Sequence, residues 1–496
     1  MPLFSRPEYQ IGRGETPESR VEVPFFVAFM VFSSVALLVF HLYVRDEALT
    51  IALAVSMVIF AITFLRVELG VYFLIVCMLL SPEIDAGPLG MGQRSLNLRY
   101  DDILIVVVFG GVLVKQAFEG ENRLWRPSPI NAGIAAYYLV CILSTLLALR
   151  RSLPLFEANK QATAFVMLKM AEFYMVFLLV GSAIRDARQI RRLLVPFFLV
   201  ALVVAVYAIS SRLSAVERVS APFEKGGTEP NTLGGYLVIV ICLAAALFTQ
   251  APTRKTRTIA LVIAALGFFP LLYTLSRASY VALVAALLGL GVVARKPLLV
   301  AGIVVLLLLS PIIMPGDVQE RVLGTFQPQG EAVRVAGLDT GITVDKSTHE
   351  RLYVWQKVAY NLHFWPWLGG GVCWARVLDS QYARVLIETG LIGFIAFLFM
   401  QWRLLRTSLE AYRWSGDWVG RSIGLAAFAS TIGLMVHSLG TISFLIVRVM
   451  EPFWLLMGLV VVVRALAIED YVRTKEENHA REHAALAQGA GAESAA

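Results

Sequence analysis

Arg277 is the only charged residue between residues 258 and 294, a stretch long enough for two membrane helices. It lies in Leu275-Ser276-Arg277-Ala278-Ser279, where the expected helical hairpin turns. Charge is costly at membrane depth, so an arginine without an acid nearby in the sequence indicates a function. A planar guanidinium group fits the oxygens of phosphate. We therefore expect Arg277 to bind an anionic ligand; the alternative is that it anchors the hairpin at the lipid headgroups.

Polar residues also gather in a long segment, residues 316–385, which interrupts the apolar runs of the chain. This segment holds seven Lys or Arg and seven Asp or Glu residues, so its formal charge is zero and any anion site in it must be local. Ser347 and Glu350 have the spacing of a capping box, which predicts a helix with Arg351 and Trp355 on one face.

The sequence Asp379-Ser380-Gln381-Tyr382 comes just before the next apolar run. Under the family resemblance given below, Asp379 is a candidate general base, because a carboxylate poised near a hydroxyl group can remove its proton. The alternative is that Asp379 caps the helix that begins at Ser380. His349 and His363 lie in the same segment and are rival bases, although each is more often a solvated loop histidine.

Lys169 and Glu172 are three residues apart within an apolar run, which places them on one face of a helix. They can form an ion pair with each other, or Lys169 can bind an anionic substrate. Arg448 and Glu451 repeat this spacing near the last apolar run, with the same two interpretations.

The elements that must position these residues are membrane helices. The chain is 58% hydrophobic and 16% charged, with a mean hydropathy of +0.70, which leaves too little polar surface for a soluble body of 54.6 kDa. Runs of about 20 apolar residues, enough to cross a hydrocarbon core of roughly 30 Å, recur along it. We place helices at residues 24–44, 48–65, 67–81, 102–118, 129–149, 162–184, 193–210, 231–250, 258–275, 277–294, 297–315, 386–406, 420–438 and 450–468. The third run is short, so the sequence predicts twelve to fourteen membrane helices.

Loop charges predict the orientation of these helices. Alternate short loops are basic and therefore cytoplasmic by the positive-inside rule; they carry Arg185, Arg188, Arg191 and Arg192, then Arg254, Lys255 and Arg257, then Arg295 and Lys296, then Arg403, Arg406, Arg413 and Arg421. Residues 1–23, without a cleavable signal peptide, and the tail 469–496, expected to be solvated and frayed, then both lie in the cytoplasm. Between them, residues 24–315 hold the first eleven helices and residues 386–468 the last three. Residues 316–385 lie outside, on the periplasmic side in a bacterium, and the four cysteines suggest no disulfide framework.

Several short motifs follow one another in an order that resembles the O-antigen ligase and O-antigen polymerase superfamily, over about residues 225–400. They are Ser276-Arg277, Glu350-Arg351 with Trp355, Pro366 to Gly371, and Asp379 to Tyr382 followed by Glu388-Thr389-Gly390-Leu391-Ile392-Gly393. Pro230-Asn231, after a loop that contains Gly226-Gly227, is similar to the same family. The order of the motifs around one long outer loop is more specific than any single motif.

The resemblance implies an all-α, GT-C-like membrane glycosyltransferase of the bacterial inner membrane, whose donor is an undecaprenyl-diphosphate-linked glycan. Such enzymes transfer the glycan on the periplasmic face to an acceptor hydroxyl, without metal or other cofactor. Arg277 and Arg351 would bind the leaving diphosphate, with Asp379 as the catalytic base. The candidate substrate-binding residues are Lys169, Asn231, Gln381, Tyr382 and Arg384. The implied partners are the donor, a glycan or lipid-linked acceptor, membrane lipids, a chain-length regulator and a flippase, but no nucleic acid.

One position departs from the ligases of this superfamily. Ligases generally have a histidine where this chain has Asp379, so the resemblance favours a polymerase of O-antigen or exopolysaccharide, with a ligase to lipid A-core as the alternative. A second alternative is a transporter or lipid-linked oligosaccharide flippase, which could have as many helices and intramembrane charges. Such transporters usually have paired halves with interrupted helices, and the sequence has no such pairing.

Overall fold

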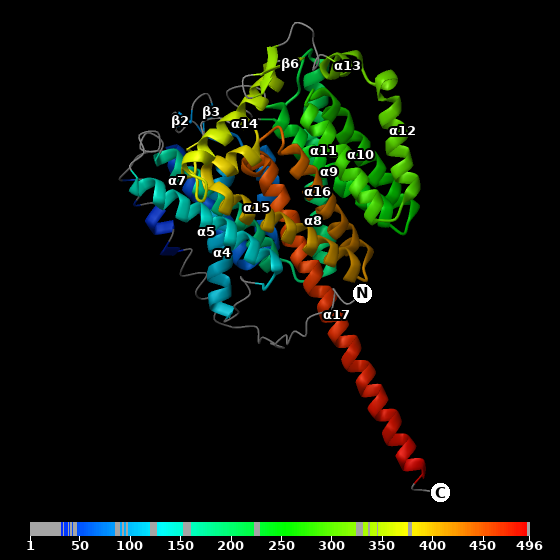
Figure 1. The fold of residues 1–496 in the computed structure, drawn as a ribbon. Coiled ribbons are helices and arrows are strands. Elements are labelled where there is room, and N and C mark those ends of the chain that lie inside the picture. The colour runs from blue at the N-terminus through cyan, green and yellow to red at the C-terminus, as the bar shows by residue number, and fades with distance from the viewer. Residues whose placement is uncertain are drawn as a thin grey trace.

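The described part of the chain is mostly helical (Figure 1). The structure, a computed structural model, describes residues 31–32, 34–37, 39, 42, 47–84, 90–91, 94–95, 98–119, 126–151, 160–222, 229–323, 331–335, 338–344, 346–374 and 379–493. Its α-helices are α2 (Glu47–Leu65), α3 (Val67–Leu80), α4 (Tyr100–Glu119), α5 (Pro129–Arg150), α7 (Lys160–Ala183), α8 (Ala187–Leu213), α9 (Pro230–Gln250), α10 (Arg254–Tyr273), α11 (Arg277–Val293), α12 (Pro297–Ile313), α13 (Gly316–Leu323), α14 (Lys346–Phe364), α15 (Gln381–Trp414), α16 (Trp418–His437) and α17 (Val447–Glu493).

Short antiparallel strand pairs join some of these helices. β1 (Glu83–Ile84) pairs with β4 (Leu98–Arg99), β2 (Gly90–Met91) with β3 (Arg94–Ser95), and β5 (Glu331–Val335) with β6 (Leu338–Val344). The last pair, with α13 and α14, occupies the long segment between the apolar runs. We call the end of the helix bundle at which α13 and α14 lie the loop end (Figure 1).

Eight of the described helices are long and apolar enough to cross a membrane, namely α5, α7, α8, α9, α10, α15, α16 and α17 from Val447 to His479. Four shorter apolar helices accompany them, at Thr50–Leu65, Val67–Leu80, Arg277–Val293 and Pro297–Ser310. These helices confirm an all-α, multi-pass membrane protein. The first predicted span, residues 24–44, lies largely outside the described residues, and the predicted twelfth span begins earlier than expected, at Gln381.

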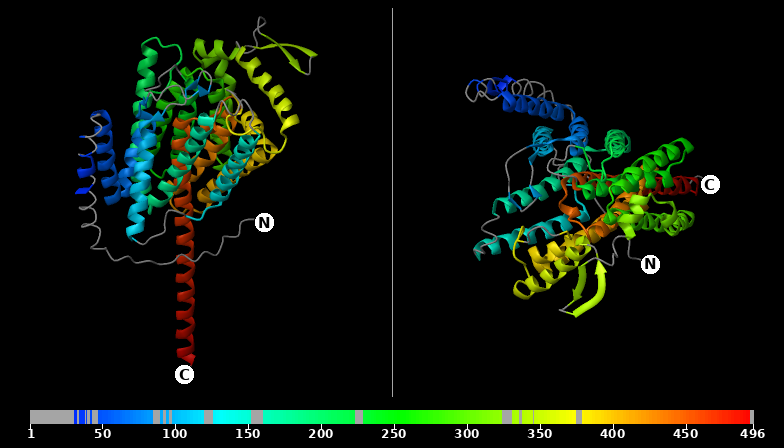
Figure 2. Two further views of the ribbon diagram at one scale, coloured as in Figure 1. Left: turned by 90° about the vertical axis from the view of Figure 1, so that its left-hand side faces the viewer. Right: turned by 90° about the horizontal axis from the view of Figure 1, so that it is seen from above.

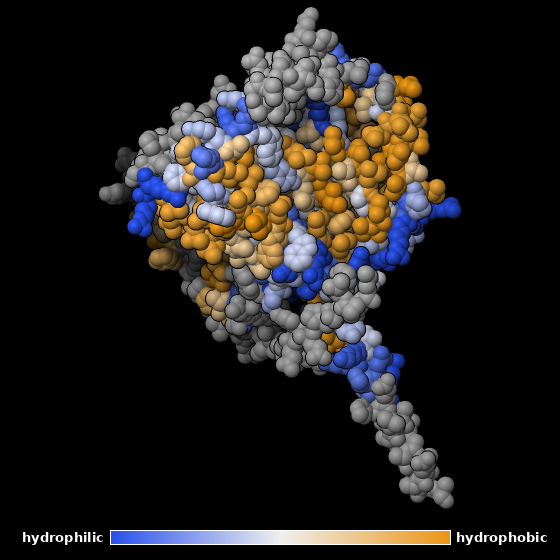
Figure 3. All heavy atoms as spheres, in the orientation of Figure 1, coloured by the Kyte–Doolittle hydropathy of each residue, from blue (hydrophilic) through white to orange (hydrophobic). Residues whose placement is uncertain are grey.

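The surface of the bundle has the pattern expected for a protein surrounded by lipid. Apolar side chains cover a broad band across the face drawn in Figure 3, with hydrophilic side chains above and below it. Within that band, α12 exposes Leu298, Leu308 and Ile312, which are 88%, 72% and 79% accessible. Large apolar side chains so exposed are stable where the surrounding solvent is a lipid chain.

The centre of the bundle is formed around α16, which packs against α9, α11 and α15. Small residues allow this close approach: a Cβ atom on Gly424 would lie 2.4 Å from the backbone nitrogen of Tyr412, and one on Gly433 would lie 2.9 Å from Cγ1 of Val238. Close contact between backbones is the usual way in which membrane helices associate.

The last helix, α17, runs through the bundle and extends well beyond it (Figures 1 and 2). It continues as a helix to Glu493, where the sequence suggested a frayed tail after residue 468. Residues 469–488 contain no Gly or Pro and are rich in Ala, Glu, Lys and Arg. These residue types favour helix even where no packing supports it.

Helix α15 is broken at Gly390, whose backbone has φ 66° and ψ −165°. The break leaves the amides of Leu391 and Ile392 without acceptors inside the helix, and they donate to the carbonyls of Pro366 at 2.9 Å and Trp367 at 3.1 Å. Because unsatisfied backbone groups are very costly in lipid, this exchange is what allows the helix to break inside the bundle.

The segment that accepts these bonds also donates to α15. The amides of Gly370 and Gly371 donate to the carbonyls of Ile387 at 3.0 Å and Glu388 at 2.9 Å. We call residues 366–371 together with residues 387–392 the interlocked joint. Two of the motifs noted in the sequence, Pro366 to Gly371 and Glu388 to Gly393, are therefore the two sides of one structural element.

Neighbouring helices fasten the joint from both sides. The hydroxyl oxygen of Ser144 in α5 lies 2.6 Å from the carbonyl oxygen of Glu388. On the other side, Val354 and Val358 of α14 are buried against Leu386 and Ile387 of α15. The joint thus holds α14 and the first turns of α15 in one place.

Gly390→Ala should destabilise the protein, because only glycine readily adopts this backbone conformation and a Cβ atom would lie 2.4 Å from the carbonyl oxygen of Trp367. The backbone strain alone costs about 1–3 kcal/mol. We expect a lower midpoint of thermal unfolding in detergent. The matched control is Gly416→Ala, where a Cβ atom meets nothing within 4 Å. An equal loss in both variants would contradict this account of the joint.

Candidate functional site

A chain of buried polar side chains connects three helices at the loop end. The hydroxyl of Ser276 donates to Oδ1 of Asn231 at 2.7 Å, and the hydroxyl of Ser279 donates to that of Ser276 at 2.8 Å. Ser279 in turn lies 3.0 Å from Nε2 of His437. Gly234 makes room for this chain, because a Cβ atom there would overlap the Ser279 hydroxyl. The chain fixes the first turn of α11, which carries Arg277, against α9 and α16.

The chain continues from His437 to the start of α15. Nδ1 of His437 lies 2.7 Å from the hydroxyl oxygen of Ser443 and 3.0 Å from that of Thr441. The amide of Gln381 donates to the carbonyls of Ser438 and Thr441, each at 3.0 Å. The structure therefore brings the predicted residues Asn231 and Gln381 to the two ends of one hydrogen-bonded network.

Three arginines gather beside this network: Arg218 from the segment after α8, Arg277 at the start of α11, and Arg321 near the end of α13. We call them the arginine cluster. Burial lowers the pKa of Arg218, and the positive charges of Arg321 and Arg277 lower it further, against the opposing effect of Glu217 and Tyr280. Like charges that act on one another repel, and an anion bound at the cluster would relieve this repulsion.

Backbone contacts place Arg218 next to Arg277. The amide of Val219 donates to the carbonyl of Tyr273 at 3.1 Å, and Nε of Arg218 donates to the carbonyl of Thr274 at 3.3 Å. These two carbonyls belong to the turn between α10 and α11, directly before Ser276 and Arg277. The segment after α8 is therefore attached to the turn that carries the predicted anion-binding arginine.

An ion pair places the third member of the cluster. Asp317, one turn before Arg321 in α13, pairs with Arg212 at the end of α8. Arg212 also lies over the ring of Tyr273, 4.6 Å from its centre. The Nε atom of Arg321 is buried and has no hydrogen-bond acceptor among the described residues. A buried donor of this kind is available to a ligand oxygen.

The remaining predicted catalytic residues lie on the elements that the interlocked joint holds. Arg351 is in the second turn of α14, but its side chain, like that of His349, lies outside the described residues. Asp379 is half-buried and directly precedes Ser380, which is the N-cap residue of α15. The cap position expected for Asp379 is thus taken by its neighbour. His363 is exposed at the end of α14, with its ring against Phe364.

Two predicted substrate-binding residues lie in buried ion pairs instead. Nζ of Lys169 pairs with Asp102 and, at 3.2 Å, with Glu172. Nε of Arg384 pairs with Glu388 at 2.9 Å. These contacts match the ion-pair interpretation of Lys169 that we weighed above.

Two further predicted residues form contacts of other kinds. Tyr382 donates from its hydroxyl to the carbonyl of Met435 at 2.7 Å, so it fastens α15 to α16. Arg448 donates to the carbonyl of Pro222. This is a contact other than the expected one with Glu451, three residues later in the same helix.

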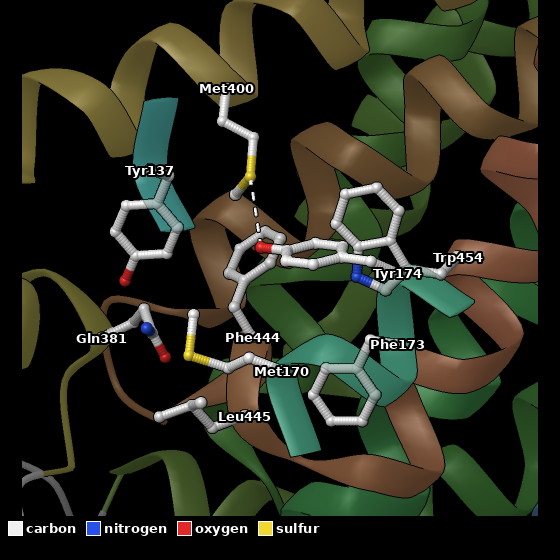
Figure 4. A pocket seen from close by; sticks show the side chains of 9 residues that line it. All are labelled: Tyr137, Met170, Phe173, Tyr174, Gln381, Met400, Phe444, Leu445 and Trp454. Atoms are coloured by element: carbon white, nitrogen blue, oxygen red, sulfur yellow. Dashed lines mark hydrogen bonds between the residues drawn. The ribbon is translucent and has the colours of Figure 1, made fainter. Parts of the chain in front are cut away.

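A narrow cavity lies between the start of α15 and the helices α5, α7 and α17 (Figure 4). Its lining is mostly aromatic and sulfur-containing, and consists of Tyr137, Met170, Phe173, Tyr174, Gln381, Met400, Phe444, Leu445 and Trp454. The Gln381 side chain is 2% exposed, and its Oε1 atom has no hydrogen-bond donor among the described residues. Gln381 therefore offers an acceptor to a small polar group in this cavity.

Three residues of the site were not predicted from the sequence. Arg218 and Arg321 are ordinary loop arginines until the fold brings them to Arg277. His437 lies within a predicted membrane span, residues 420–438, and an ionisable residue at such a position is a functional signal that could have identified it.

The comparison with known proteins identifies no relative: no protein-family model matches the chain, and no curated protein sequence matches it at a significant level. The interpretation of the site therefore depends on its own geometry and on the sequence resemblance.

Cys373, which follows the joint, tests how tightly this region is closed. It is fully buried, its amide donates to Oε1 of Glu388 at 2.9 Å, and burial, followed by the charge of Glu388, raises the pKa of its thiol to about 12. Maleimides react with the thiolate, whose population falls as the pKa rises. We expect a charged maleimide to label Cys373 about 100-fold or more slowly than an exposed thiol at pH 7.5, and labelling to stay slow up to pH 9.

The measurement uses a chain in which Cys77, Cys141 and Cys242 are replaced by Ala. The control adds Ser214→Cys at an exposed position after α8. Equal labelling rates for the two thiols would mean that the region around Cys373 opens to water.

Proposed function

We propose that this chain is a membrane glycosyltransferase that moves a glycan from a polyprenyl diphosphate carrier to an acceptor hydroxyl, and that it builds a surface polysaccharide by repeating this step. The proposed location is the periplasmic face of a bacterial inner membrane, with both termini in the cytoplasm. The proposed donor is an undecaprenyl-diphosphate-linked glycan, and the proposed acceptor is a second lipid-linked glycan.

The observation that carries this proposal is the arginine cluster. Arg218, Arg277 and Arg321 come from three separate segments, and backbone and ion-pair contacts hold them together at the loop end of the bundle. A diphosphate carries several negative oxygens and fits such a cluster better than a single carboxylate does.

The chemistry needs few groups. The acceptor oxygen attacks the anomeric carbon of the donor sugar, the bond from that carbon to the diphosphate oxygen breaks, and the diphosphate leaves with the electron pair. The arginines stabilise the negative charge that develops on the leaving group. Asp379 accepts the proton of the acceptor hydroxyl, and the sugar carbon is inverted. Most of the rate enhancement comes from holding two large substrates in the correct orientation.

Asp379 favours polymerisation over ligation to lipid A-core. It stands at a position where the ligases of the superfamily that the sequence resembles generally have a histidine. It is half-buried and directly precedes Ser380, the N-cap residue of α15, at the loop end of the bundle.

Removing one arginine of the cluster should weaken both donor binding and transfer. We expect Arg218→Ala, Arg277→Ala and Arg321→Ala each to slow transfer about 100-fold or more, because each removes a donor to a charge that grows in the transition state. Release of undecaprenyl diphosphate by the purified protein in detergent measures the rate, and quenching of tryptophan fluorescence by the donor measures binding.

The matched control for the arginines is Arg257→Ala. Arg257 also donates from Nε to a backbone carbonyl, that of Ala251 at 2.8 Å, but it lies at the opposite end of α10. Transfer at the wild-type rate in all three cluster variants would exclude the proposed diphosphate site.

Asp379→Asn should separate chemistry from binding. The amide keeps the shape of the side chain but cannot accept the proton, so we expect transfer to fall about 10²- to 10⁴-fold while the affinity for the donor stays the same. Asp470→Asn, an exposed carboxyl on α17 that pairs with Arg473, is the control. Full activity of Asp379→Asn would mean that another group is the base.

A further inference from the structure

A group of buried carboxyls lies at the start of α4 and of α17, apart from the residues that the proposed reaction uses. Asp101, Asp102 and Glu451 are 0%, 7% and 0% exposed. Each of them offers an oxygen, and these oxygens all lie within 4.8 Å of one another. We call these three residues the carboxyl group site.

Two cations lie next to the site and are paired with its acids, although Nε and Nη1 of Arg99 have no hydrogen-bond acceptor among the described residues. Nη2 of Arg99 pairs with Asp101 at 2.9 Å and donates to the carbonyl of Met78 at 2.8 Å. Nζ of Lys169 pairs with Asp102 and, at 3.2 Å, with Glu172. No ion pair involving Glu451 is found among the described residues.

Glu451 is the residue that points to a ligand. It is fully buried, its side chain lies next to the carboxyl of Asp101, and neither of its oxygens accepts a hydrogen bond from an N–H or O–H group of the described residues. Arg448, three residues earlier, donates to the carbonyl of Pro222. Buried carboxylates this close to one another are strongly unfavourable in a medium of low polarity unless a cation or a proton compensates their charge.

The charge balance of the region indicates the size of that compensation. Asp101, Asp102, Glu172 and Glu451 are four acids, and Arg99 and Lys169 are two bases, so the group has a formal charge of −2. One divalent cation would neutralise it. All the donor atoms are carboxylate oxygens, which favour hard cations such as Mg²⁺ and Ca²⁺ over Zn²⁺ or Cu²⁺.

The spacing of the oxygens also fits such an ion. Oxygen ligands lie about 2.0–2.6 Å from Mg²⁺ or Ca²⁺, so two ligands on opposite sides of the ion are separated by roughly 4–5 Å. The carboxylate oxygens of the site all lie within 4.8 Å of one another, which agrees with this range. Waters would complete the coordination, as is usual for Mg²⁺.

We infer that the carboxyl group site binds one hard divalent cation, Mg²⁺ or Ca²⁺, between Asp101, Asp102 and Glu451. The ion joins α4 to α17, two helices far apart in the sequence. The ion has no part in the transfer step proposed above, and the inference does not depend on that step.

The test uses the full-length protein in detergent, stripped with EDTA and dialysed, and Mn²⁺ as a paramagnetic probe. Titration followed by electron paramagnetic resonance should find one tight Mn²⁺ site per chain, from which Mg²⁺ or Ca²⁺ displaces the probe. Glu451→Gln, which removes the charge but keeps the shape, should weaken Mn²⁺ binding more than tenfold. The midpoint of thermal unfolding of the wild-type protein, but not of Glu451→Gln, should rise when the cation is added.

The control variant is Glu410→Gln. Glu410 is also buried and forms ion pairs, with Arg406 at 3.1 Å and Arg464 at 2.8 Å. It lies near the C-terminal end of α15, outside the carboxyl group site. It should leave the tight Mn²⁺ site unchanged, so that a loss confined to Glu451→Gln assigns the ion to the proposed residues. If Glu451→Gln does not fold, Glu451→Asp serves in its place, because a shorter carboxylate should weaken but not abolish the site.

Three results would overturn the inference. The first is that titration of the wild-type protein finds no tight Mn²⁺ site with a stoichiometry of one per chain. The second is an affinity for Mn²⁺ that is the same in the wild-type protein and in the Glu451 variants. The third is an infrared band of a protonated carboxyl group that is present in the wild-type protein both without metal and with Mg²⁺, and that is missing in Glu451→Gln. Such a band would mean that a shared proton, and not a cation, compensates the charge.

Discussion

The break in α15 is the constraint from which the loop end of the molecule is built. A helix interrupted inside a membrane bundle must find new partners for its backbone groups, and here the carbonyls of Pro366 and Trp367 accept from the amides that Gly390 leaves unpaired. Because residues 366–371 accept these hydrogen bonds, they lie against α15. Helix α14, which directly precedes them in the chain, is therefore held next to α15 as well. Backbone hydrogen bonds therefore help to hold the first turns of α15, with Asp379 just before them, in place.

The fold class could be predicted from the sequence because composition and the length of apolar runs depend only on the surrounding solvent. Most helix positions follow for the same reason. The interlocked joint could not be predicted, because a glycine-rich stretch such as Trp367 to Gly371 has no periodicity that indicates its partner. The continuation of α17 to Glu493 was missed for the opposite reason: its polar composition suggested a solvated end, but its residues favour helix without packing.

The candidate site was predictable only in part. Arg277 was found because it is isolated in an apolar stretch, and the structure places it beside Asn231 and the network that reaches Gln381. Arg218 and Arg321 could not be found in this way, because each lies among other polar residues in the sequence. Only the fold, through contacts between residues far apart in the chain, brings them to Arg277. Conversely, the intramembrane position of Lys169 suggested substrate binding as well as an ion pair with Glu172, but its partner Asp102 is on another helix and is not apparent from the spacing.

The two charged regions of the molecule can be understood together. Near the arginine cluster, Asp317 pairs with Arg212, and in the other region Glu451 faces Asp101 and Asp102. Arg448, which could have neutralised Glu451, donates to a backbone carbonyl. The fold thus gathers side chains of like charge in two places, arginines in the first region and carboxyls in the second. In surroundings of low polarity, an ion or ligand of opposite sign stabilises such a group. For that reason we assign an anionic substrate to the first region and a cation to the second, where spacing in the sequence alone would have suggested internal ion pairs.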